Sequence, residues 1–281
     1  LVAAKNVLWK KKASLLDKAN RALQESSPEG IHDLRVALRR VSATASALGE
    51  RSLAKKSKKI VRSLSAARQI EVDRKLLSRV RELGWLPDEV AFGVDARWSA
   101  RLREGEKDVS RVPEAELQSL RRKLARFAKK SPSDLLPRLE KARIRAEENL
   151  SKELSDPASD RSLHRYRLAV KKARYLAEDL ALMGSRGLET EIEGKKALQD
   201  AFGRWNDLRL FRRDLEKARS EAERRGTVTF VSELDRLISA LEPAVESARA
   251  QALRSAGAGG ATAKVRRRTR RSSDSPGSRA S

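Results

Sequence analysis

A nine-residue pattern that occurs twice constrains this chain more than any other feature of its sequence. The first copy is His32–Arg40 (HDLRVALRR), and the second is His164–Lys172 (HRYRLAVKK). Both copies read histidine, two residues, arginine, an aliphatic residue, alanine, another aliphatic residue and two cations. The chain contains 2 histidines, and each of them opens one copy. The apolar positions recur at helical spacing, so both copies are predicted to lie on amphipathic helices.

On a helix, each copy separates a cationic side from an apolar side. With about 100° between successive residues, the histidine and the cations fall together and the apolar residues fall opposite them. The predicted core faces consist of Leu34, Leu38, Val41, Ala45 and Leu48 in the first copy and of Tyr166, Val170, Ala173, Ala177 and Leu180 in the second. A basic helix face is commonly only a solvated surface. Its repetition together with both histidines favours an anion-binding role.

The net charge also indicates a polyanionic partner. Lys and Arg number 63 against 39 Asp and Glu, which leaves a formal net charge of +24. The segment Lys264–Ser281 holds seven cations and one acid, so most of the excess lies in the rest of the chain. Such a charge is typical of proteins that bind nucleic acid, an anionic membrane surface or a phosphate polymer.

Several other classes of site are excluded or not expected. The chain has no cysteine, so disulfides and thiolate metal ligands are ruled out. Two histidines cannot build a multi-histidine metal site, and no metal or other cofactor is expected. No apolar run reaches the roughly 18 residues of a membrane span. The N-terminal residues lack the order of a secretory signal, so we expect a soluble cytoplasmic protein without a membrane partner.

Proline and glycine divide the sequence into helical segments, and no series of strands is evident. Helices are predicted over about residues 3–25, 27–48, 53–83, 88–104, 114–129 and 131–154, and then over about 188–224 and 229–254. The helix that carries His164 is predicted to begin near either Asp156 or Ser159 and to end near Met183. Residues 257–281 are rich in Ala, Gly, Ser and Arg and are predicted to form a disordered basic tail.

The two halves of the chain correspond beyond the histidine motifs. The segment Leu64–Gln69 matches Phe202–Asp207 at a similar offset. The repeat unit of roughly 130 residues is too long for a solenoid and is better explained by a duplicated helical bundle. We therefore predict one domain over residues 3–254, with pseudo-repeats at about 3–105 and 114–254.

The cationic sides suit phosphate. Guanidinium groups offer forked donors that match phosphate oxygens, and lysine supplies a compact charge. Cations three or four residues apart rise by about 5–6 Å per step along a helix, so one face can contact successive units of a polymer. Each histidine lies early in its helix, where free N–H groups also favour an anion. The sequence leaves open whether the histidines contact the ligand or orient the arginines.

These motifs resemble the CHAD domain, a histidine-containing α-helical family. The family pattern His-x-x-Arg-Val-x-x-Arg-Arg matches His32–Arg40, and its second-half pattern His-x-x-Arg-x-x-x-Lys-Lys-x-Arg-Tyr matches His164–Tyr175. A further family pattern, Leu-Gln-x-x-x-Gly-x-x-Asn-Asp, matches Leu198–Asp207. The resemblance covers about residues 3–254. It implies an all-α fold of two pseudo-symmetric helical bundles that share a basic central groove or pore.

The resemblance also implies a function, namely the binding of inorganic polyphosphate and association with polyphosphate granules. Carried over residue by residue, the implied binding set is His32, Arg35, Arg39 and Arg40 with His164, Arg167, Lys171, Lys172 and Arg174. The cations Lys55, Lys59 and Arg62 recur at helical spacing and would extend this set; an ordinary surface face explains them equally well. No catalytic residue is predicted.

The first half departs from the family pattern downstream of its histidine motif. The family has Leu-Gly-x-x-Arg-Asp-x-Asp-Val, whereas this chain has LSAARQIEV over residues 64–72. Glycine is replaced by Ser65, and the two aspartates are replaced by Gln69 and Glu71. If the family acids orient a cation of the binding set, the first half is expected to be less tightly organised here.

Two other functions compete with polyphosphate binding. The run Arg266–Arg271 suits a loose nucleic-acid contact through the tail. A helix-borne histidine among arginines also suits phosphohistidine transfer or a phosphatase. No acid/base constellation, acidic magnesium cluster or glycine-rich phosphate loop supports an enzyme, so we predict a non-catalytic protein. The oligomeric state does not follow from the sequence.

Overall fold

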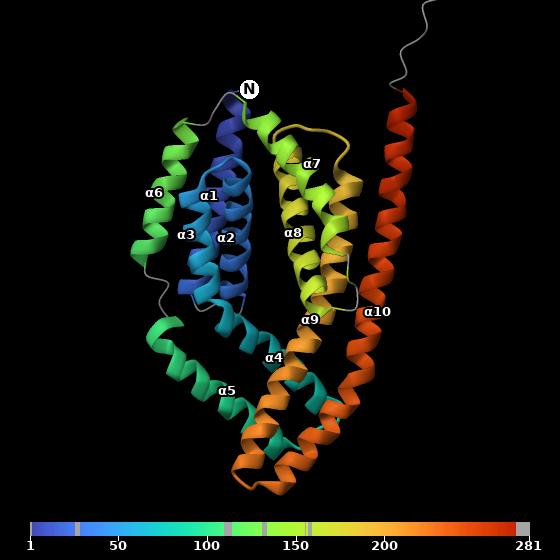
Figure 1. Cartoon of the computed structure of the whole chain (residues 1–281). Coiled ribbons are helices and arrows are strands. Elements are labelled where there is room, and N and C mark those ends of the chain that lie inside the picture. Colours follow the sequence, from blue (N-terminus) through green and yellow to red (C-terminus); the bar gives the residue numbers. More distant parts are fainter. Residues whose placement is uncertain are drawn as a thin grey trace, which may run out of the picture.

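Figure 1 shows the computed structural model of the chain as a cartoon. The structure describes residues 2–25, 29–109, 114–130, 134–154, 156 and 159–273. Within these ranges it contains ten α-helices and no β-strand, which confirms the predicted all-α class. None of the described helices combines the length and apolarity that a membrane crossing requires.

The helices follow one another through short connections. The first half of the chain contains α1 (Val2–Gln24), α2 (Gly30–Ala47), α3 (Arg51–Ser63), α4 (Ser65–Glu82) and α5 (Asp88–Val109). The second half contains α6 (Glu114–Lys130), α7 (Leu135–Glu153), α8 (Asp160–Leu182), α9 (Glu189–Arg224) and α10 (Val228–Ser273). Of the two predicted starts of α8, the structure uses the second, because the Ser159 hydroxyl accepts a hydrogen bond from the Ser162 N–H and caps the helix.

The single helix predicted over residues 53–83 is wrong, because the segment forms two helices, α3 and α4, on either side of Leu64. From α2, the Arg35 guanidinium donates to the Val61 carbonyl at 2.8 Å. The Ser65 hydroxyl donates to the same carbonyl at 2.9 Å. A carbonyl that has these partners no longer depends on the helical backbone ladder, so the chain can turn there without glycine or proline.

The last helix is longer than predicted. The sequence analysis ended it near residue 254 and assigned residues 257–281 to a disordered tail, whereas α10 is helical as far as Ser273. Residues 274–281 of the predicted tail lie outside the described part of the chain. Extending a helix costs far less than starting one, and alanine has the highest helix propensity, so the mixed Ala and Gly run after Ala256 can continue it.

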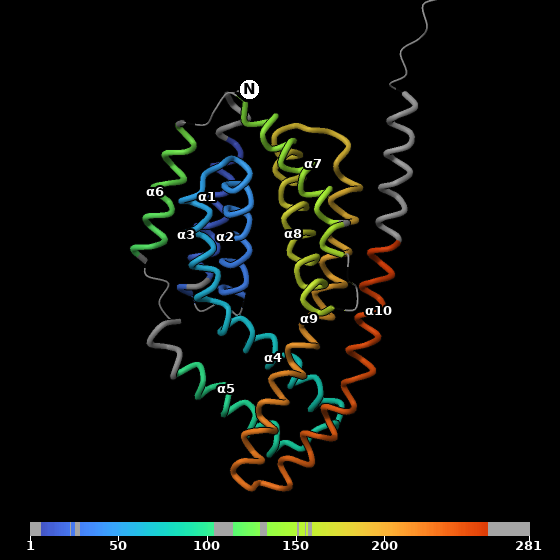
Figure 2. Tube along the Cα trace, in the orientation of Figure 1, coloured from blue at the N-terminus to red at the C-terminus, as the bar shows by residue number. Residues whose placement is uncertain are grey.

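The core faces predicted for the two motif helices are confirmed, because all ten of their residues are buried. The apolar face of α2 packs with α1, α3, α6 and part of α8 in one cluster, and a second cluster joins α4, α5, α9 and α10. A third cluster joins α8 with α9 and α10 around Tyr166, Phe202 and Trp205. Figure 2 shows the long α9 running from beside α8 to the end of the molecule where α4 and α5 lie.

A buried polar junction lies where α1, α2 and α8 meet. The Asp179 carboxylate of α8 accepts hydrogen bonds from the Lys12 ammonium of α1 and, at 2.5 Å, from the Thr44 hydroxyl of α2. Lys12, Thr44 and Asp179 are each at most 3% exposed. Since burying a charge is costly unless it is paired, this junction specifies how α8 sits against α1 and α2.

Candidate functional site

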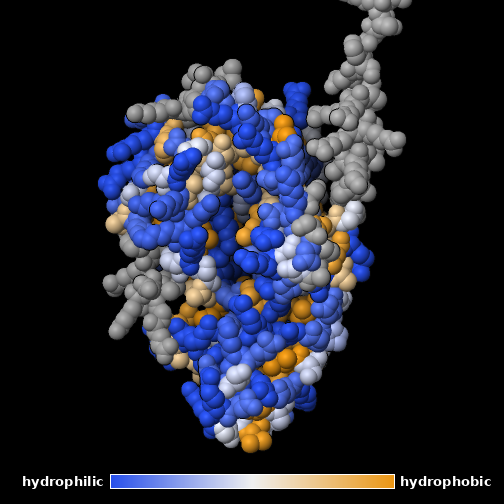
Figure 3. All heavy atoms as spheres, in the orientation of Figure 1, coloured by the Kyte–Doolittle hydropathy of each residue, from blue (hydrophilic) through white to orange (hydrophobic). Residues whose placement is uncertain are grey.

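The two histidine motifs, which lie far apart in the sequence, come together because α2 packs against α8. The Lys171 ammonium of α8 interacts electrostatically with His32 and with Arg39 of α2. Arg39 interacts with Arg167 of α8 in the same way. Figure 3 shows hydrophilic side chains around a hollow in the molecular face between the α1–α3 group and α8. The structure thus brings the cationic sides of the two motifs to one place.

Cations of α4 and α9 also lie at this place. The Arg68 guanidinium of α4 acts on His32, Arg35 and Arg39. The Arg209 guanidinium of α9 acts on His164 and Arg167. We use the name cationic cluster for the set His32, Arg39, Arg68, His164, Arg167, Lys171 and Arg209. Four helices therefore contribute to a single concentration of positive charge.

Partial burial and mutual repulsion shape the ionisation of the cationic cluster. Burial, followed by the Arg167 and Arg39 charges, lowers the pKa of Lys171 to about 6. Burial also lowers the pKa of Arg39 and of Arg167. Burial and the nearby Arg68 lower the pKa of His32, and burial and Arg167 lower that of His164. Every one of these shifts disfavours the charged form in the free protein.

Three cations at the centre of the cationic cluster are not neutralised by a direct partner. Arg39, Arg167 and Lys171 form no hydrogen bond or ion pair with any residue that the structure describes. Asp207 of α9 is the nearby carboxylate that acts on Arg167 and Lys171. Half-buried cations that outnumber their carboxylates are electrostatically unfavourable until an anion enters, which makes this position suited to a polyanion.

The structure gives Arg35, another residue of the predicted set, a partner within the protein. Arg35 is 8% exposed and donates to the Val61 carbonyl and to the Ser65 hydroxyl, at 2.8 and 2.9 Å. Burial, followed by the Arg39 and Arg68 charges, lowers its pKa to about 10. Arg35 therefore adds positive potential to the site while it fastens the α3–α4 junction to α2.

Arg40 of α2 and Arg174 of α8 contact the same two side chains at the interface of these helices. The Glu178 carboxylate pairs with Arg40 at 2.6 Å and with Arg174 at 3.5 Å. Both guanidinium groups stack on the Tyr175 ring, at 5.1 and 5.2 Å from its centroid. This arrangement clamps the two helices together, and membership of the binding set stays a prediction for both arginines.

The remaining predicted cations are exposed. Lys172 lies on the exposed side of α8, and Lys55, Lys59 and Arg62 lie on the exposed side of α3. Lys59 pairs with Glu116 of α6 at 3.0 Å. None of these four residues is among the main charges that act on His32, His164, Arg167 or Lys171. Their part in binding stays a prediction.

The sequence analysis did not place Arg68, Asn206 or Arg209 in the site. Asn206 lies beside His164 and raises the pKa of the imidazole against the stronger effect of burial. Arg209 pairs with Asp160 at 3.1 Å and stacks on Trp205. For two of these residues the sequence carried a signal, because Arg68 and Asn206 belong to the two family patterns downstream of the histidine motifs. Only packing shows that both motifs end beside the histidines.

The departures from the family pattern in α4 are compensated by local contacts. Ser65 accepts the hydrogen bond from Arg35, and Glu71 pairs with Arg68 at 2.9 Å. Gln69 donates to the Asp73 carboxylate at 2.8 Å. Each substituted side chain thus has a partner, and Glu71 still orients a cation of the cluster. The expectation that the first half is less tightly organised is therefore not supported by these contacts.

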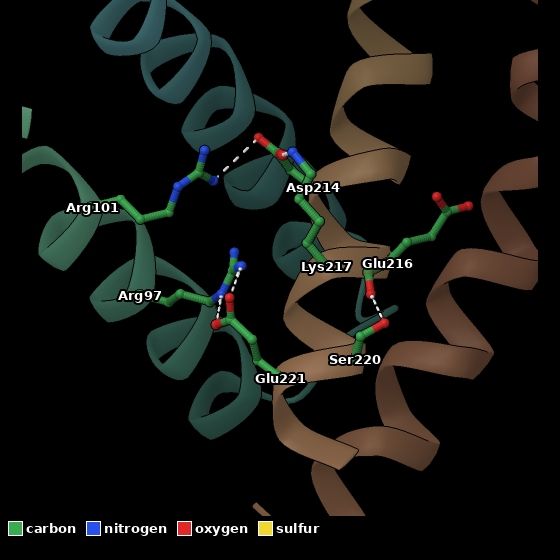
Figure 4. Close-up of polar contacts among 7 residues, drawn as sticks. All are labelled: Arg97, Arg101, Asp214, Glu216, Lys217, Ser220 and Glu221. Carbon is green, nitrogen blue, oxygen red and sulfur yellow. Dashed lines mark hydrogen bonds and ion pairs between the residues drawn. The ribbon is translucent and has the colours of Figure 1, made fainter. Parts of the chain in front are cut away.

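Beyond Gln69, a buried carboxylate pair joins α4 to α9. Asp73 is 0% exposed, and burial together with the nearby Asp214 raises its pKa to about 7. Asp214 remains the ionised partner, because Lys217 and Arg101 lie 2.9 and 3.6 Å from it. Figure 4 shows these contacts beside the Arg97–Glu221 pair, which ties α5 to α9 at 2.6 Å. In the described part of the chain, no group of three or more His, Cys, Asp or Glu is placed to hold a metal ion.

We expect Asp73→Asn to stabilise the protein at alkaline pH. The native pKa of Asp73 lies above the ordinary aspartate value of about 3.9, so stability falls as the pH rises from about 4 to 7. Asparagine keeps an acceptor for Gln69 and a donor for Asp214 without this penalty. Urea unfolding should give a gain that grows with pH, up to about 4 kcal/mol at pH 8.

Asp88→Asn is the matched control for this measurement, because its carboxylate is 65% exposed and pairs with Arg81 at the surface. It should change stability by less than about 1 kcal/mol at any pH. A gain from Asp73→Asn that stays constant between pH 5 and 8 would show that Asp73 is ionised throughout in the native protein.

The chain is similar to one protein family and to two solved structures. Residues 7–216 match the family model of the CHAD domain. Two solved structures share the fold over 90% of this chain. The structure titled PptA from Streptomyces chartreusis is 18% identical, with 98% of its chain covered and a TM-score of 0.67. The CHAD domain from the plant Ricinus communis is 19% identical, with 91% covered and a TM-score of 0.66. No curated protein sequence matches the chain.

Proposed function

The chain belongs to the CHAD domain family, which is associated with polyphosphate binding in general, and from this premise we propose that it binds inorganic polyphosphate without catalysing a reaction on it. The observation that carries the proposal is the trio Arg39, Arg167 and Lys171. These cations are partly buried, mutually repelling and without a direct anionic partner among the described residues. An entering phosphate would supply the missing charge and the hydrogen-bond acceptors.

The extent of the cationic cluster favours a polymer over a single phosphate group. Its members come from α2, α4, α8 and α9, and the hollow in Figure 3 lies between two of these helices. We propose that α2 and α8 form the walls of a shared basic groove, with the two halves of the chain related by pseudo-symmetry. The exposed cations of α3 and α8 would extend the groove, and the predicted place of the protein is on polyphosphate granules in the cytoplasm.

The surroundings of the histidines support binding rather than catalysis. His164 lies beside Asn206 and among Arg167, Arg209 and Lys171. Such cationic neighbours attract phosphate. Incubation with radiolabelled phosphodonors should leave no acid-labile phosphate on either histidine; labelling of His32 or His164 would instead establish phosphoryl transfer.

A titration of fluorescently labelled polyphosphate tests the proposal. Five or so phosphate contacts predict that affinity falls by about 100-fold between 50 and 200 mM salt, because bound counterions are released. Affinity should also rise with chain length. The absence of saturable binding at low salt would contradict the proposed function.

A competition experiment separates polyphosphate binding from general nucleic-acid binding. The comparison uses the full chain and a variant that ends at Gly257, which lacks the Arg266–Arg271 run. Polyphosphate affinity should survive the truncation, whereas any loose binding of DNA should fall with the lost cations. Displacement of polyphosphate by DNA at equal phosphate concentration would favour the nucleic-acid alternative.

A further inference from the structure

Gly203 lies inside the long helix α9 at a position where packing does not require glycine. In the part of the chain that the structure describes, a Cβ atom added at Gly203 would come within 4 Å of no other helix and of no side chain except those of its direct neighbours. The residue belongs to the continuous helix Glu189–Arg224 and not to a turn. Glycine is less favourable than alanine in a helix interior. Folding alone therefore does not explain the choice of glycine.

Gly203 lies on the side of α9 that faces α8 and the cationic cluster. The Phe202 ring next to it packs on the Tyr166 ring of α8, with 5.1 Å between the two centroids. Asp207, one helical turn beyond Gly203, is the carboxylate that acts on Arg167. Residues four apart share a helix face, so Gly203 and Arg167 border the same space between the two helices.

The first half of the chain shows what a side chain at the corresponding position does. In the sequence repeat, Arg35 corresponds to Arg167. Ser65 corresponds to Gly203 in the downstream segment. The Ser65 hydroxyl accepts a hydrogen bond from the Arg35 guanidinium at 2.9 Å, and the Val61 carbonyl accepts another at 2.8 Å. Arg35 is thereby held inside the protein.

Arg167 has neither of these acceptors. At the same offset, Val61 corresponds to Gln199, whose carbonyl lies within the continuous helix α9 and is used by the helical backbone. Gly203 has no hydroxyl to take the place of the Ser65 side chain. The Arg167 Nε is buried and has no hydrogen-bond partner among the described residues. The two corresponding arginines therefore differ in whether the protein itself satisfies them.

We propose that Gly203 is a positioning residue for the polyanion, because the absence of a side-chain acceptor there leaves the Arg167 guanidinium free to bind phosphate. The inference rests on the proposed function and assigns a role in it to a residue without charge. It also gives the two arginines unequal roles, since Arg35 fastens the α3–α4 junction whereas Arg167 binds the ligand. An internal acceptor would compete with phosphate oxygens for the same N–H groups.

Titration of the full-length protein with fluorescently labelled polyphosphate, at one low salt concentration, tests the proposal. Gly203→Ser should weaken binding about tenfold, because the new hydroxyl can accept a hydrogen bond from Arg167. Gly203→Ala adds a side chain without an acceptor and should lose less affinity than Gly203→Ser. Gly194→Ser is the matched control, since Gly194 is exposed on α9 and a Cβ there also meets nothing. It should bind like the native protein.

A second pair of variants shows whether the serine acts through Arg167. In an Arg167→Ala background, adding Gly203→Ser should cause no further loss of affinity, so the two substitutions are not additive. A purely structural effect of the serine would persist in that background. Serine and alanine both favour a helix interior more than glycine does, so the melting midpoints of the Gly203 variants should not fall below that of the native protein.

The outcomes separate the inference from the function on which it rests. Native affinity in Gly203→Ser, an equal loss in Gly203→Ala, or a loss that persists without Arg167 overturns the inference and leaves the proposed function intact. The absence of saturable polyphosphate binding by the native protein overturns both. A loss that is largest for Gly203→Ser and disappears in the Arg167→Ala background supports the inference.

Discussion

Replacing Arg39 and Lys171 together with glutamine is expected to weaken polyphosphate binding by at least about 100-fold at neutral pH and fixed salt. The two side chains lie on α2 and α8 at the centre of the cationic cluster and have no direct partner among the described residues. Each would donate a charge-assisted hydrogen bond to phosphate, and two such bonds are worth about 3 kcal/mol or more. A fluorescence titration with labelled polyphosphate measures the loss.

A control must separate the local contacts from the overall positive charge. Lys141 and Arg145 are exposed on α7, and replacing both with glutamine removes the same net charge from another surface. This control should lower affinity by less than about tenfold, since exposed charges act through screened solvent. Equal losses in the two double variants would show that the protein attracts polyphosphate by net charge alone and would contradict a defined site.

Asp179→Asn is expected to destabilise the native protein by about 3–5 kcal/mol in urea unfolding at pH 7. Asp179 is 2% exposed and is the carboxylate that compensates the buried Lys12 ammonium. Asparagine can still accept the hydrogen bond from Thr44, but it leaves Lys12 as an uncompensated charge in the core. The effect is therefore expected to exceed that of a lost surface ion pair.

A second substitution shows whether the uncompensated charge is the cause. Adding Lys12→Met to Asp179→Asn removes the buried ammonium group and should restore most of the lost stability, because an apolar side chain needs no counter-charge. The exposed pair of Glu193 with Lys196 provides the control, and Glu193→Gln should change stability by less than about 1 kcal/mol. A double variant no more stable than Asp179→Asn would contradict this explanation.

Local patterns in the sequence were enough to predict most of the helices. The periodicity of the two motifs placed Leu34, Leu38 and Val170 in the core, and all three are buried. The break at Leu64 could not be predicted in the same way. It depends on the Arg35 guanidinium, which reaches a carbonyl 26 residues further along the chain. A contact between helices leaves no periodic signal in either of them.

The candidate site could likewise be predicted only in part from the sequence. The spacing of each motif shows that His32 and Arg39 share a helix face, as do His164, Arg167 and Lys171. It does not show that Arg40 and Arg174 share one carboxylate, Glu178, or that Arg68 and Arg209 approach from α4 and α9. These facts follow from how four helices pack.

By itself, the sequence determined the helical class, the two amphipathic motif helices and the excess of positive charge. Each of these depends on residues that are near one another along the chain or on composition alone. Only the tertiary structure decided which cations meet without a partner. Burial and repulsion act over distances in space, and the packing of α2 against α8 is what brings the two histidine motifs, first noticed as a repeat in the sequence, into a single cluster.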